Sequence, residues 1–386
     1  MTFILSSNNI FDYLSEHSLD NKKEEALSKV EPISAKNFNL LVTFADGRKL
    51  LVKQERHNQQ GKTIGEFQNE WLFQNFLNQF PQLEPWRLFL PKVVHFDLEN
   101  SIIVSTYLDN YENLMNLYRK ENSFPEEITV EIGKALATVH RDTFNCQEHR
   151  EFFSDRTNHL INEQVHKFVN NLERITPEIF GIVPGDGLKF FALYQRYNSL
   201  GEAITQLSNS FNPCCFTHND FSLNNILLRT NWQEEKENIV KLIDWERCDW
   251  GDPTFDVGTL IGSYLQLWLN SLVISKSLTI EESLRLATTP LELLQPSLAS
   301  FILTYLQTFP EILEHFPDFL PRAIQFAGFS LIQQIQAMIQ YQKSFGNTGI
   351  AMLQVAKTLL CRPQQSIPTI FGTAATKLSQ FSTSLV

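Results

Sequence analysis

The chain has 386 residues, 43% of them hydrophobic, and its 43 acidic and 32 basic residues give a formal net charge of −11 at pH 7. This length suggests two or three domains or lobes, and the acidic balance argues against a nucleic-acid binder, which needs a basic face. The most apolar run, at 264–274, is too short to span a membrane. Five cysteines without a C-x-x-C pair, and a start that does not resemble a signal peptide, predict a cytoplasmic protein with reduced thiols.

The N-terminal part of the chain has the pattern of a small β-rich lobe. Two apolar runs flank Ala-Asp-Gly-Arg at 45–48, and Asp-Gly between apolar runs predicts a hairpin over residues 38–53. Apolar side chains at helical spacing, followed by prolines, predict a helix from Glu66 to Phe80. A second hairpin is expected around residues 93–108. With a leading helical arm, these elements predict a lobe at residues 1–106.

The rest of the chain, residues 107–386, is expected to form a larger and mainly helical lobe. Ser123 and Glu126 have the spacing of a capping box, with a proline in the first turn, and predict the start of a helix that ends near His140. A helix-rich stretch is expected over residues 155–210. The two parts together predict an α+β fold.

The residues that carry chemistry lie in two nearby segments. Asp220 can take a proton from a hydroxyl, Asn225 lies five residues later, and Asp244 ends the next apolar strand. Phosphoryl transfer from a nucleotide needs such a base together with oxygen ligands for a metal ion, and hard oxygen ligands suit Mg²⁺ rather than zinc. The spacing from Asp220 to Asn225 matches the catalytic loop of protein kinases, H-R-D-x-x-x-x-N.

These segments resemble a known family. The run from His218 to Leu228 is similar to the H-G-D-x-x-x-x-N-I-L motif of the aminoglycoside phosphotransferase and choline kinase group. The run IDWERCDWGDPTFDVG, from Ile243 to Gly258, resembles that group's I-D-W-E…G-D-P…D run, and weaker similarity extends from about residue 30 to residue 262. The resemblance implies a protein-kinase-like, two-lobed fold and an enzyme that transfers the γ-phosphoryl group of ATP, with Mg²⁺, to a hydroxyl of a small molecule.

The same resemblance implies roles for the two motif segments. Asp220 is the expected catalytic base, and Asn225 and Asp244 are the expected Mg²⁺ ligands. His218 is expected to hydrogen-bond the catalytic loop. By resemblance, Asp256 is a buried aspartate that holds the backbone of that loop.

In the small lobe, we expect a lysine to bind the phosphates and a glutamate to pair with that lysine. Lys53 ends an apolar strand, which is the place of the kinase lysine that holds the α- and β-phosphates. We prefer Glu70 as its partner because Glu70 shares the apolar face of the predicted helix. Glu66 stays open as the alternative, although the helix dipole alone favours an acid there. The resemblance implies that the backbone at Thr106 and Leu108 meets adenine.

The sequence departs from the family pattern in its phosphate loop and its catalytic loop. The segment 33–39 contains no glycine, so a close approach of the backbone to phosphate is less assured. Asn219 and Asn224 replace glycines of the catalytic loop, and asparagine tolerates left-handed geometry better than most residues. These departures keep open a non-catalytic, nucleotide-binding relative of the same fold. The missing D-F-G and A-P-E motifs argue against a protein kinase.

The acceptor is expected to be an amino sugar, an amino alcohol or a sugar, because the family acts on such molecules. The net charge of −11 and the acids at Glu246, Asp249 and Asp252 favour a cationic acceptor, since a cleft of one charge sign concentrates ligands of the other. We expect no nucleic-acid or membrane partner. The sequence leaves the oligomeric state and the choice between ATP and GTP open.

Overall fold

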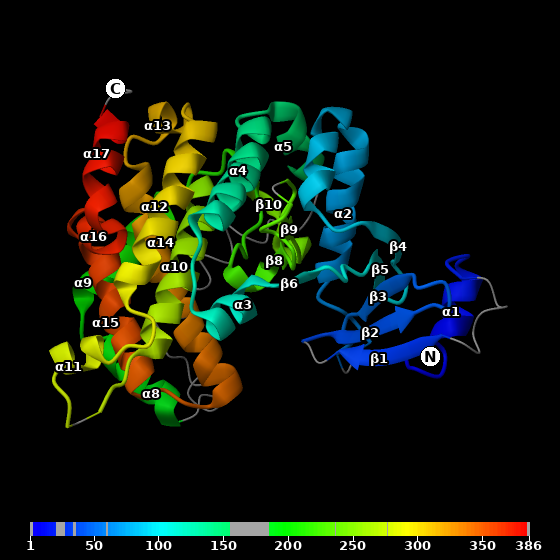
Figure 1. The fold of residues 1–386 in the computed structure, drawn as a ribbon, viewed down its shortest axis with the longest axis horizontal. Helices are drawn as coiled ribbons and strands as arrows, with labels where there is room; N and C mark the ends of the chain where they lie inside the picture. The colour runs from blue at the N-terminus through cyan, green and yellow to red at the C-terminus, as the bar shows by residue number, and fades with distance from the viewer. Residues whose placement is uncertain are drawn as a thin grey trace. The chain divides into compact units, whose positions relative to one another are not determined.

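A computed structural model of the chain describes residues 3–20, 28–33, 36–58, 61–154, 185–235, 237–275 and 277–383. Part of the predicted helix-rich stretch, at 155–184, and part of the glycine-free segment, at 34–35, lie outside these residues. The chain forms two compact units (Figure 1). The first comprises Met1–Glu112 and Arg229–Cys248, and the second comprises Asn113–Leu228 and Asp249–Val386.

The first unit contains an antiparallel sheet with the strand order β1-β2-β3-β5-β4. Its strands are β1 (Lys29–Ile33), β2 (Phe38–Thr43), β3 (Lys49–Gln54), β4 (Val93–Asp97) and β5 (Ile102–Thr106). Both predicted hairpins are confirmed, because β2 pairs with β3 and β4 pairs with β5. Gly47, in the turn between β2 and β3, has a φ of 86°, the left-handed region that glycine enters without steric cost.

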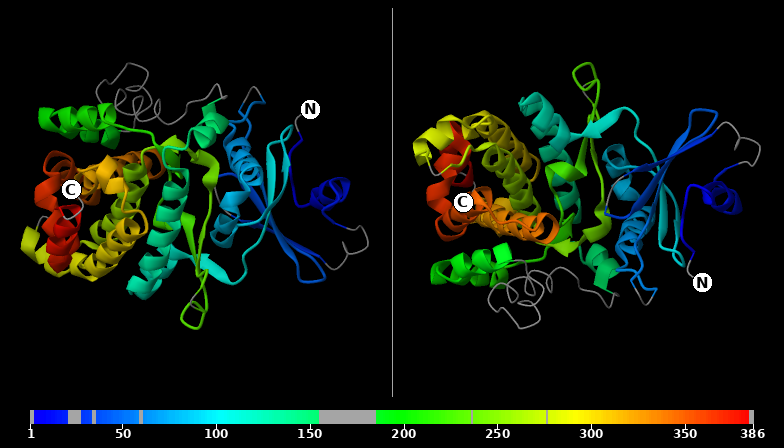
Figure 2. Two further views of the ribbon diagram at one scale, coloured as in Figure 1. Left: turned by 90° about the horizontal axis from the view of Figure 1, so that it is seen from above. Right: turned by 90° about the horizontal axis from the view of Figure 1, so that it is seen from below.

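The two faces of this sheet have different side chains because neighbouring residues of a strand point to opposite faces. Leu40, Val42, Leu50 and Val52 are buried on one face, where they pack against the helix α1 (Ile10–Glu16). The other face carries the remaining side chains of β2 and β3. Figure 2 shows α1 and the helix α2 (Glu66–Gln79) on opposite faces of the sheet.

The helix predicted from Glu66 to Phe80 is confirmed as α2, which is followed by the 3-10 helix η2 (Pro81–Phe89). The carboxylate of Glu55 caps α2, because its Oε1 accepts the backbone N–H groups of Gly65 and Glu66 at 3.1 and 3.0 Å. Phe73 of α2 stacks on Trp245, with 4.5 Å between ring centroids. Strand β3 and the segment around Trp245 are therefore both fixed to α2.

The second unit is mainly helical, and Figure 1 shows its helices. They are α3 (Leu114–Glu121), α4 (Glu126–Thr143), α5 (Gln147–Ser154), α8 (Gly185–Tyr194), α9 (Asn198–Asn209), α10 (Pro253–Ser271), α11 (Ile280–Arg285), α12 (Leu291–Thr308), α13 (Ile312–His315), α14 (Phe319–Ala337), α15 (Asn347–Cys361), α16 (Pro363–Phe371) and α17 (Ala375–Thr383), with the π-helix η5 (Met338–Gln342) and the 3-10 helix η6 (Gly372–Ala374). Among the described helices, none is long and apolar enough to cross a membrane.

Short strands and 3-10 turns carry the predicted motifs. In the second unit they include β7 (Cys215–Thr217), η3 (Leu223–Asn225) and β10 (Asp249–Gly251), whereas β9 (Val240–Leu242) and η4 (Trp245–Arg247) belong to the first unit. The strands β6 (Tyr111–Asn113) and β8 (Ile226–Arg229) each contain a boundary between the units. Strand β7 pairs antiparallel with β10 within the second unit.

The predicted capping box at the start of α4 is wrong. The helix begins at Glu126, Pro125 occupies the N-cap position, and no side chain caps it. Pro125 has an extended backbone, with a ψ of 135°, so the helix starts only after the proline and Ser123 lies too far upstream to cap it. Helix α11 has a capping box instead: Thr279 Oγ1 accepts the N–H of Glu282 at 3.1 Å, and the Glu282 carboxylate accepts the N–H of Thr279.

Candidate active site

The segment predicted as the catalytic loop follows β7 in the second unit. Asn219 has a φ of 64°, so it adopts the left-handed geometry that its replacement of a glycine predicted. Asn224 does not share this geometry and lies in the 3-10 turn η3 instead. A side chain at Gly251 of β10 would place its Cβ 2.2 Å from Thr217 Oγ1, so the paired strand fits tightly against the start of the loop.

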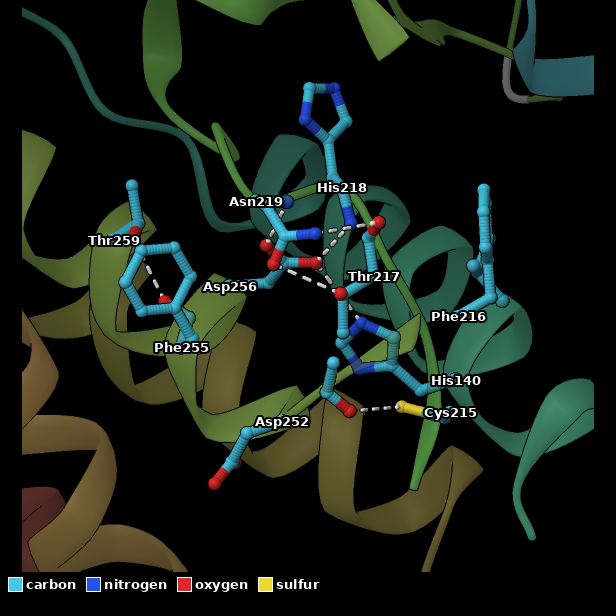
Figure 3. A network of polar contacts seen from close by, with 12 residues as sticks. His140, Cys215, Phe216, Thr217, His218, Asn219, Asp252, Phe255, Asp256 and Thr259 are labelled. Carbon is cyan, nitrogen blue, oxygen red and sulfur yellow. Dashed lines mark hydrogen bonds and ion pairs between the residues drawn. The ribbon is translucent and has the colours of Figure 1, made fainter. Parts of the chain in front are cut away.

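A buried aspartate holds the backbone of this loop (Figure 3). Asp256, in the first turn of α10, accepts the N–H of His218 on Oδ2 and the N–H of Asn219 on Oδ1, both at 2.7 Å. Asp256 is fully buried, and hydrogen bonds to an ionised acceptor are stronger than neutral ones. The predicted role of Asp256 is confirmed.

Sequence reasoning missed two residues that support Asp256. His140 Nε2 lies 3.2 Å from Asp256 Oδ2, and His140 Nδ1 lies 2.8 Å from the hydroxyl of Tyr305. In a neutral imidazole, Nε2–H donates to the carboxylate, and Nδ1 accepts from Tyr305. Burial raises the pKa of Tyr305 well above its usual value, which keeps that hydroxyl protonated. The only signal in the sequence was that the predicted helix ended at His140.

The loop then positions the residues expected to act on substrate and metal. The N–H of Asp220 donates to His218 Nδ1 at 3.3 Å, so the predicted role of His218 in the loop is confirmed. Asn225 donates from Nδ2 to the Asp220 carbonyl at 2.8 Å. This bond fixes the amide nitrogen of Asn225, so Oδ1 is the atom of that side chain suited to bind a cation.

The first unit brings the other predicted residues together. Lys53, at the end of β3, donates to Asp244 Oδ1 at 2.6 Å. Burial alone would lower the pKa of Lys53, but the charges of Asp244 and Glu70 outweigh burial, and the pKa is raised. Burial raises the pKa of Glu70 to about 7, although the Lys53 charge acts in the opposite direction. Asp244 itself has a left-handed backbone, with a φ of 59°.

The two candidate partners of Lys53 occupy different surroundings. Glu70 is buried on α2, and no hydrogen-bond partner of its Oε2 is found among the described residues. Glu66 lies at the start of α2 and pairs with Lys36, whose Nζ also lies 3.7 Å from Glu246 Oε1. Glu66 is therefore engaged by another lysine, whereas Glu70 interacts electrostatically with Lys53.

Several features of the first unit fit a nucleotide. Leu41 and Leu51 pair with each other across β2 and β3, are half-buried, and lie on the same face of the sheet as Lys53. An apolar surface suits a base, and a cation at its end suits phosphates. At the predicted adenine contact, the Thr106 N–H donates to the Lys92 carbonyl and the Leu108 carbonyl accepts from Tyr111.

A family model described as the phosphotransferase enzyme family matches residues 29–273. The chain belongs to this family. A search of curated proteins finds no match.

Solved structures of phosphotransferases resemble the chain at low identity. Aminoglycoside 2′-phosphotransferase-IIIa in complex with GDP is 12% identical with a TM-score of 0.50, and the match covers 93% of this chain and 100% of that one. The APH(2″)-IIa complex with gentamicin is 16% identical, with a TM-score of 0.47 and coverage of 96% and 99%. A choline/ethanolamine kinase family protein from Mesorhizobium loti is 13% identical, with a TM-score of 0.47 and coverage of 91% and 92%. The predicted α+β, kinase-like fold is confirmed.

In this member of the phosphotransferase enzyme family, one support of the loop segment comes from outside the residues that the family model matches. Asp252 caps α10 by accepting the N–H of Thr254 at 2.9 Å, and it forms a buried ion pair with Arg322 of α14. Asp252 also accepts the N–H of Asn212 at 3.0 Å. The start of α10, which carries Asp256, is therefore anchored by a helix that no motif predicted.

Proposed function

We propose that this phosphotransferase transfers the γ-phosphoryl group of ATP to a hydroxyl of a small molecule. The observation that carries the proposal is the catalytic loop, in which both oxygens of Asp256 hold the backbone of His218 and Asn219. It supports the proposal because it fixes the backbone just before Asp220, and Asn225 in turn donates to the Asp220 carbonyl. Asp220 and Asn225 have the spacing of the catalytic loop of protein kinases.

Each residue of the loop segment then has a role. Asp220 accepts the proton of the acceptor hydroxyl and orients that hydroxyl for attack on the γ-phosphorus. Asn225 Oδ1 and the Asp244 carboxylate would bind Mg²⁺, which is commonly held by one or two carboxylates together with phosphates and waters. When bound, Mg²⁺ would offset the charge of the β- and γ-phosphates.

The first unit would bind the nucleotide. We assign this role to residues 1–106, as the sequence predicts, and extend it to Arg229–Cys248, which belongs to the same unit. Lys53 would bind the α- and β-phosphates, and Glu70 would hold Lys53 once Asp244 turns to the metal. The Thr106 carbonyl and the Leu108 N–H would contact adenine, since the Thr106 N–H is already bonded to Lys92.

The acceptor is proposed to be a cationic or polyhydroxylated small molecule. Structures that resemble the chain include aminoglycoside phosphotransferases and choline kinases, and the net charge of −11 favours a cation. Asp252 does not add to this attraction, because it is buried and paired with Arg322. Burial also raises the pKa of Glu246 to about 7, which weakens its charge near neutral pH. We also propose a cytoplasmic location, which the five free cysteines support.

Nucleotide binding and turnover test the proposal in sequence. A thermal-shift titration with MgATP should raise the melting temperature, because a ligand that binds only the folded state stabilises it. A panel of hydroxylated amines, amino sugars and sugars, assayed for ADP release, should then reveal the acceptor. No thermal shift with any Mg²⁺-nucleotide would refute the proposal.

The glycine-free segment 33–39 supports one other function, a nucleotide-binding protein without turnover. Such a protein would show the same thermal shift with MgATP. It would release no ADP with any acceptor in the panel, and Asp220→Asn would change neither result.

A further inference from the structure

We infer that Asn39 binds the polyphosphate chain of the nucleotide, next to Lys53. The inference rests on the proposed function and deepens it, because it assigns a phosphate contact in a chain whose phosphate loop lacks glycine. Neither motif segment includes this residue. Its evidence is the register of the sheet and the burial of one amide oxygen.

The register of the β2–β3 hairpin places Asn39 directly opposite Lys53. Residues paired across antiparallel strands extend their side chains to the same face, with Cβ atoms about 4.5–5.5 Å apart. The neighbouring pair, Leu40 and Val52, is buried on the opposite face, against the core that includes α1. Asn39 and Lys53 therefore share the face that carries Leu41 and Leu51.

The Asn39 amide is buried with an acceptor unused. The side chain is 8% exposed, and none of the described residues provides a hydrogen-bond partner for Oδ1. Buried polar atoms are nearly always hydrogen-bonded, so an exception calls for a specific explanation. Glu70 Oε2 is a second buried acceptor without a partner in the described part of the chain, and it too belongs to a residue that interacts with Lys53. Two buried acceptors beside one cation lack a donor among the described residues while Lys53 is bonded to Asp244, so the Lys53 ammonium can bond to them once Asp244 binds the metal.

An asparagine amide suits this position because it both accepts and donates hydrogen bonds. The Lys53 ammonium carries three donors, so it can serve the Asn39 oxygen while it also meets phosphate. The Asn39 Nδ2 group would then donate to a phosphate oxygen. In kinase-like folds a glycine-rich loop covers the phosphates, and here a side-chain amide from the adjoining strand would take over one of those contacts.

The chain provides a matched control on the same strand. Thr43, the last residue of β2, is half-buried and pairs with Lys49 rather than with Lys53. The experiment compares Asn39→Ala, Asn39→Asp and Thr43→Ala in the full chain. Calorimetric dissociation constants are measured for MgATP, MgADP, AMP and adenosine. A melting curve for each variant shows whether the protein is folded.

Asn39→Ala should weaken binding of MgATP and MgADP by about 10- to 100-fold, as expected for one lost hydrogen bond to a charged group. Adenosine binding should stay unchanged, and Thr43→Ala should bind MgATP like the unmodified protein. Asn39→Asp keeps the shape of the side chain but opposes phosphate charge, so it should lose at least as much. If Asn39→Ala does not fold, the MgATP affinity of Asn39→Asp tests the phosphate contact instead.

Two outcomes would overturn the inference. One is unchanged MgATP binding by both Asn39 variants. The other is an equal loss for adenosine and MgATP, which would show a general disturbance of the sheet rather than a phosphate contact. The proposed function fails differently, because then the unmodified protein itself would bind no nucleotide.

Discussion

Both carboxylate oxygens of Asp256 accept backbone N–H groups of the catalytic loop, whereas Glu70 Oε2 and Asn39 Oδ1 have no hydrogen-bond partner within the described ranges. The loop segment is held by short bonds to a carboxylate buried in the second unit. In the first unit, the Lys53 cation is paired with Asp244 while the Glu70 carboxyl beside it has its pKa raised to about 7 by burial.

The difference indicates that the two regions are organised for different tasks. The loop predicted to be catalytic has its backbone fixed by Asp256, which would hold a base in position for reaction. The cluster of Lys53, Glu70 and Asn39, called the lysine cluster here, contains buried acceptors without a donor among the described residues, and this costs the free protein stability. The predictions below test this contrast between a preassembled loop and an incomplete nucleotide site.

The largest expected effect is on turnover, from Asp220→Asn. An amide of the same shape cannot accept the proton of the hydroxyl, and loss of a general base typically costs about 10²–10⁴-fold in rate. MgATP binding should be nearly unchanged, since the nucleotide is bound by other residues. Steady-state kinetics with the identified acceptor and calorimetry with MgATP provide the two measurements. Near-normal turnover would remove Asp220 from the mechanism.

The next largest effect is expected from Asp256→Ala, on both stability and turnover. The change leaves two buried backbone N–H groups without an acceptor, at about 1–3 kcal/mol each, and lets the loop move. Urea unfolding and turnover should therefore both be impaired.

Asp318→Ala is the matched control, because Asp318 precedes α14 in the same unit and forms no capping hydrogen bond. It should change stability by no more than about 0.5 kcal/mol. Similar stability of the two variants would contradict the view that Asp256 fixes the loop.

The local parts of this architecture could be predicted from the sequence. The Asp-Gly turn determines the β2–β3 hairpin through the left-handed backbone that Gly47 adopts. Asp220 and Asn225 lie five residues apart in one loop. Because this spacing depends on local sequence alone, the motif was enough to locate the loop in the chain. The predicted adenine, phosphate and metal contacts of the site residues stay predictions.

The remaining supports could not be predicted because they depend on contacts between distant segments. His140 meets Asp256 across 116 residues of sequence and Tyr305 across 165. Arg322 reaches Asp252 from a helix without a recognisable motif. The predicted capping box failed for a local reason, since Pro125 delays the start of the helix. Burial of Asn39 likewise appears only once the sheet is formed.

A pH-dependent stability is expected from Glu70. Its pKa rises from an ordinary value of 4.5 to about 7 in the folded protein, so the folded state holds this proton more tightly than the unfolded state. The bound proton of Glu70 therefore raises the free energy of unfolding. This contribution is complete below pH 4.5, is lost as the pH rises through 7, and amounts to about 3 kcal/mol.

Glu70→Gln removes this dependence. The free energy of unfolding of the unmodified protein, relative to Glu70→Gln, should therefore fall by up to about 3 kcal/mol between pH 4.5 and pH 8. Urea unfolding at a series of pH values measures it. Gln68→Ala, at an exposed position of the same helix, is the control and should follow the pH profile of the unmodified protein, because it changes no titratable group. If the difference in unfolding free energy between the unmodified protein and Glu70→Gln does not change with pH, then burial does not raise the pKa of Glu70 as described.

The smallest effect tests whether helix packing keeps the catalytic loop rigid. Gly258, half a turn after Asp256 in α10, approaches α14 so closely that an added Cβ would lie 2.4 Å from Phe326 Cβ and 2.5 Å from the Ala323 carbonyl. Gly258→Ala must therefore push the two helices apart, at about 1–3 kcal/mol, and shift Asp256 with them.

Gly201→Ala in α9 is the control: its nearest neighbour is 4.0 Å away, and alanine should stabilise that helix by about 0.5–1 kcal/mol. Urea unfolding and turnover of both variants decide the point. If Gly258→Ala loses stability but keeps full turnover, the hydrogen bonds of Asp256 alone hold the loop, and the packing of α10 on α14 serves only the stability of the second unit.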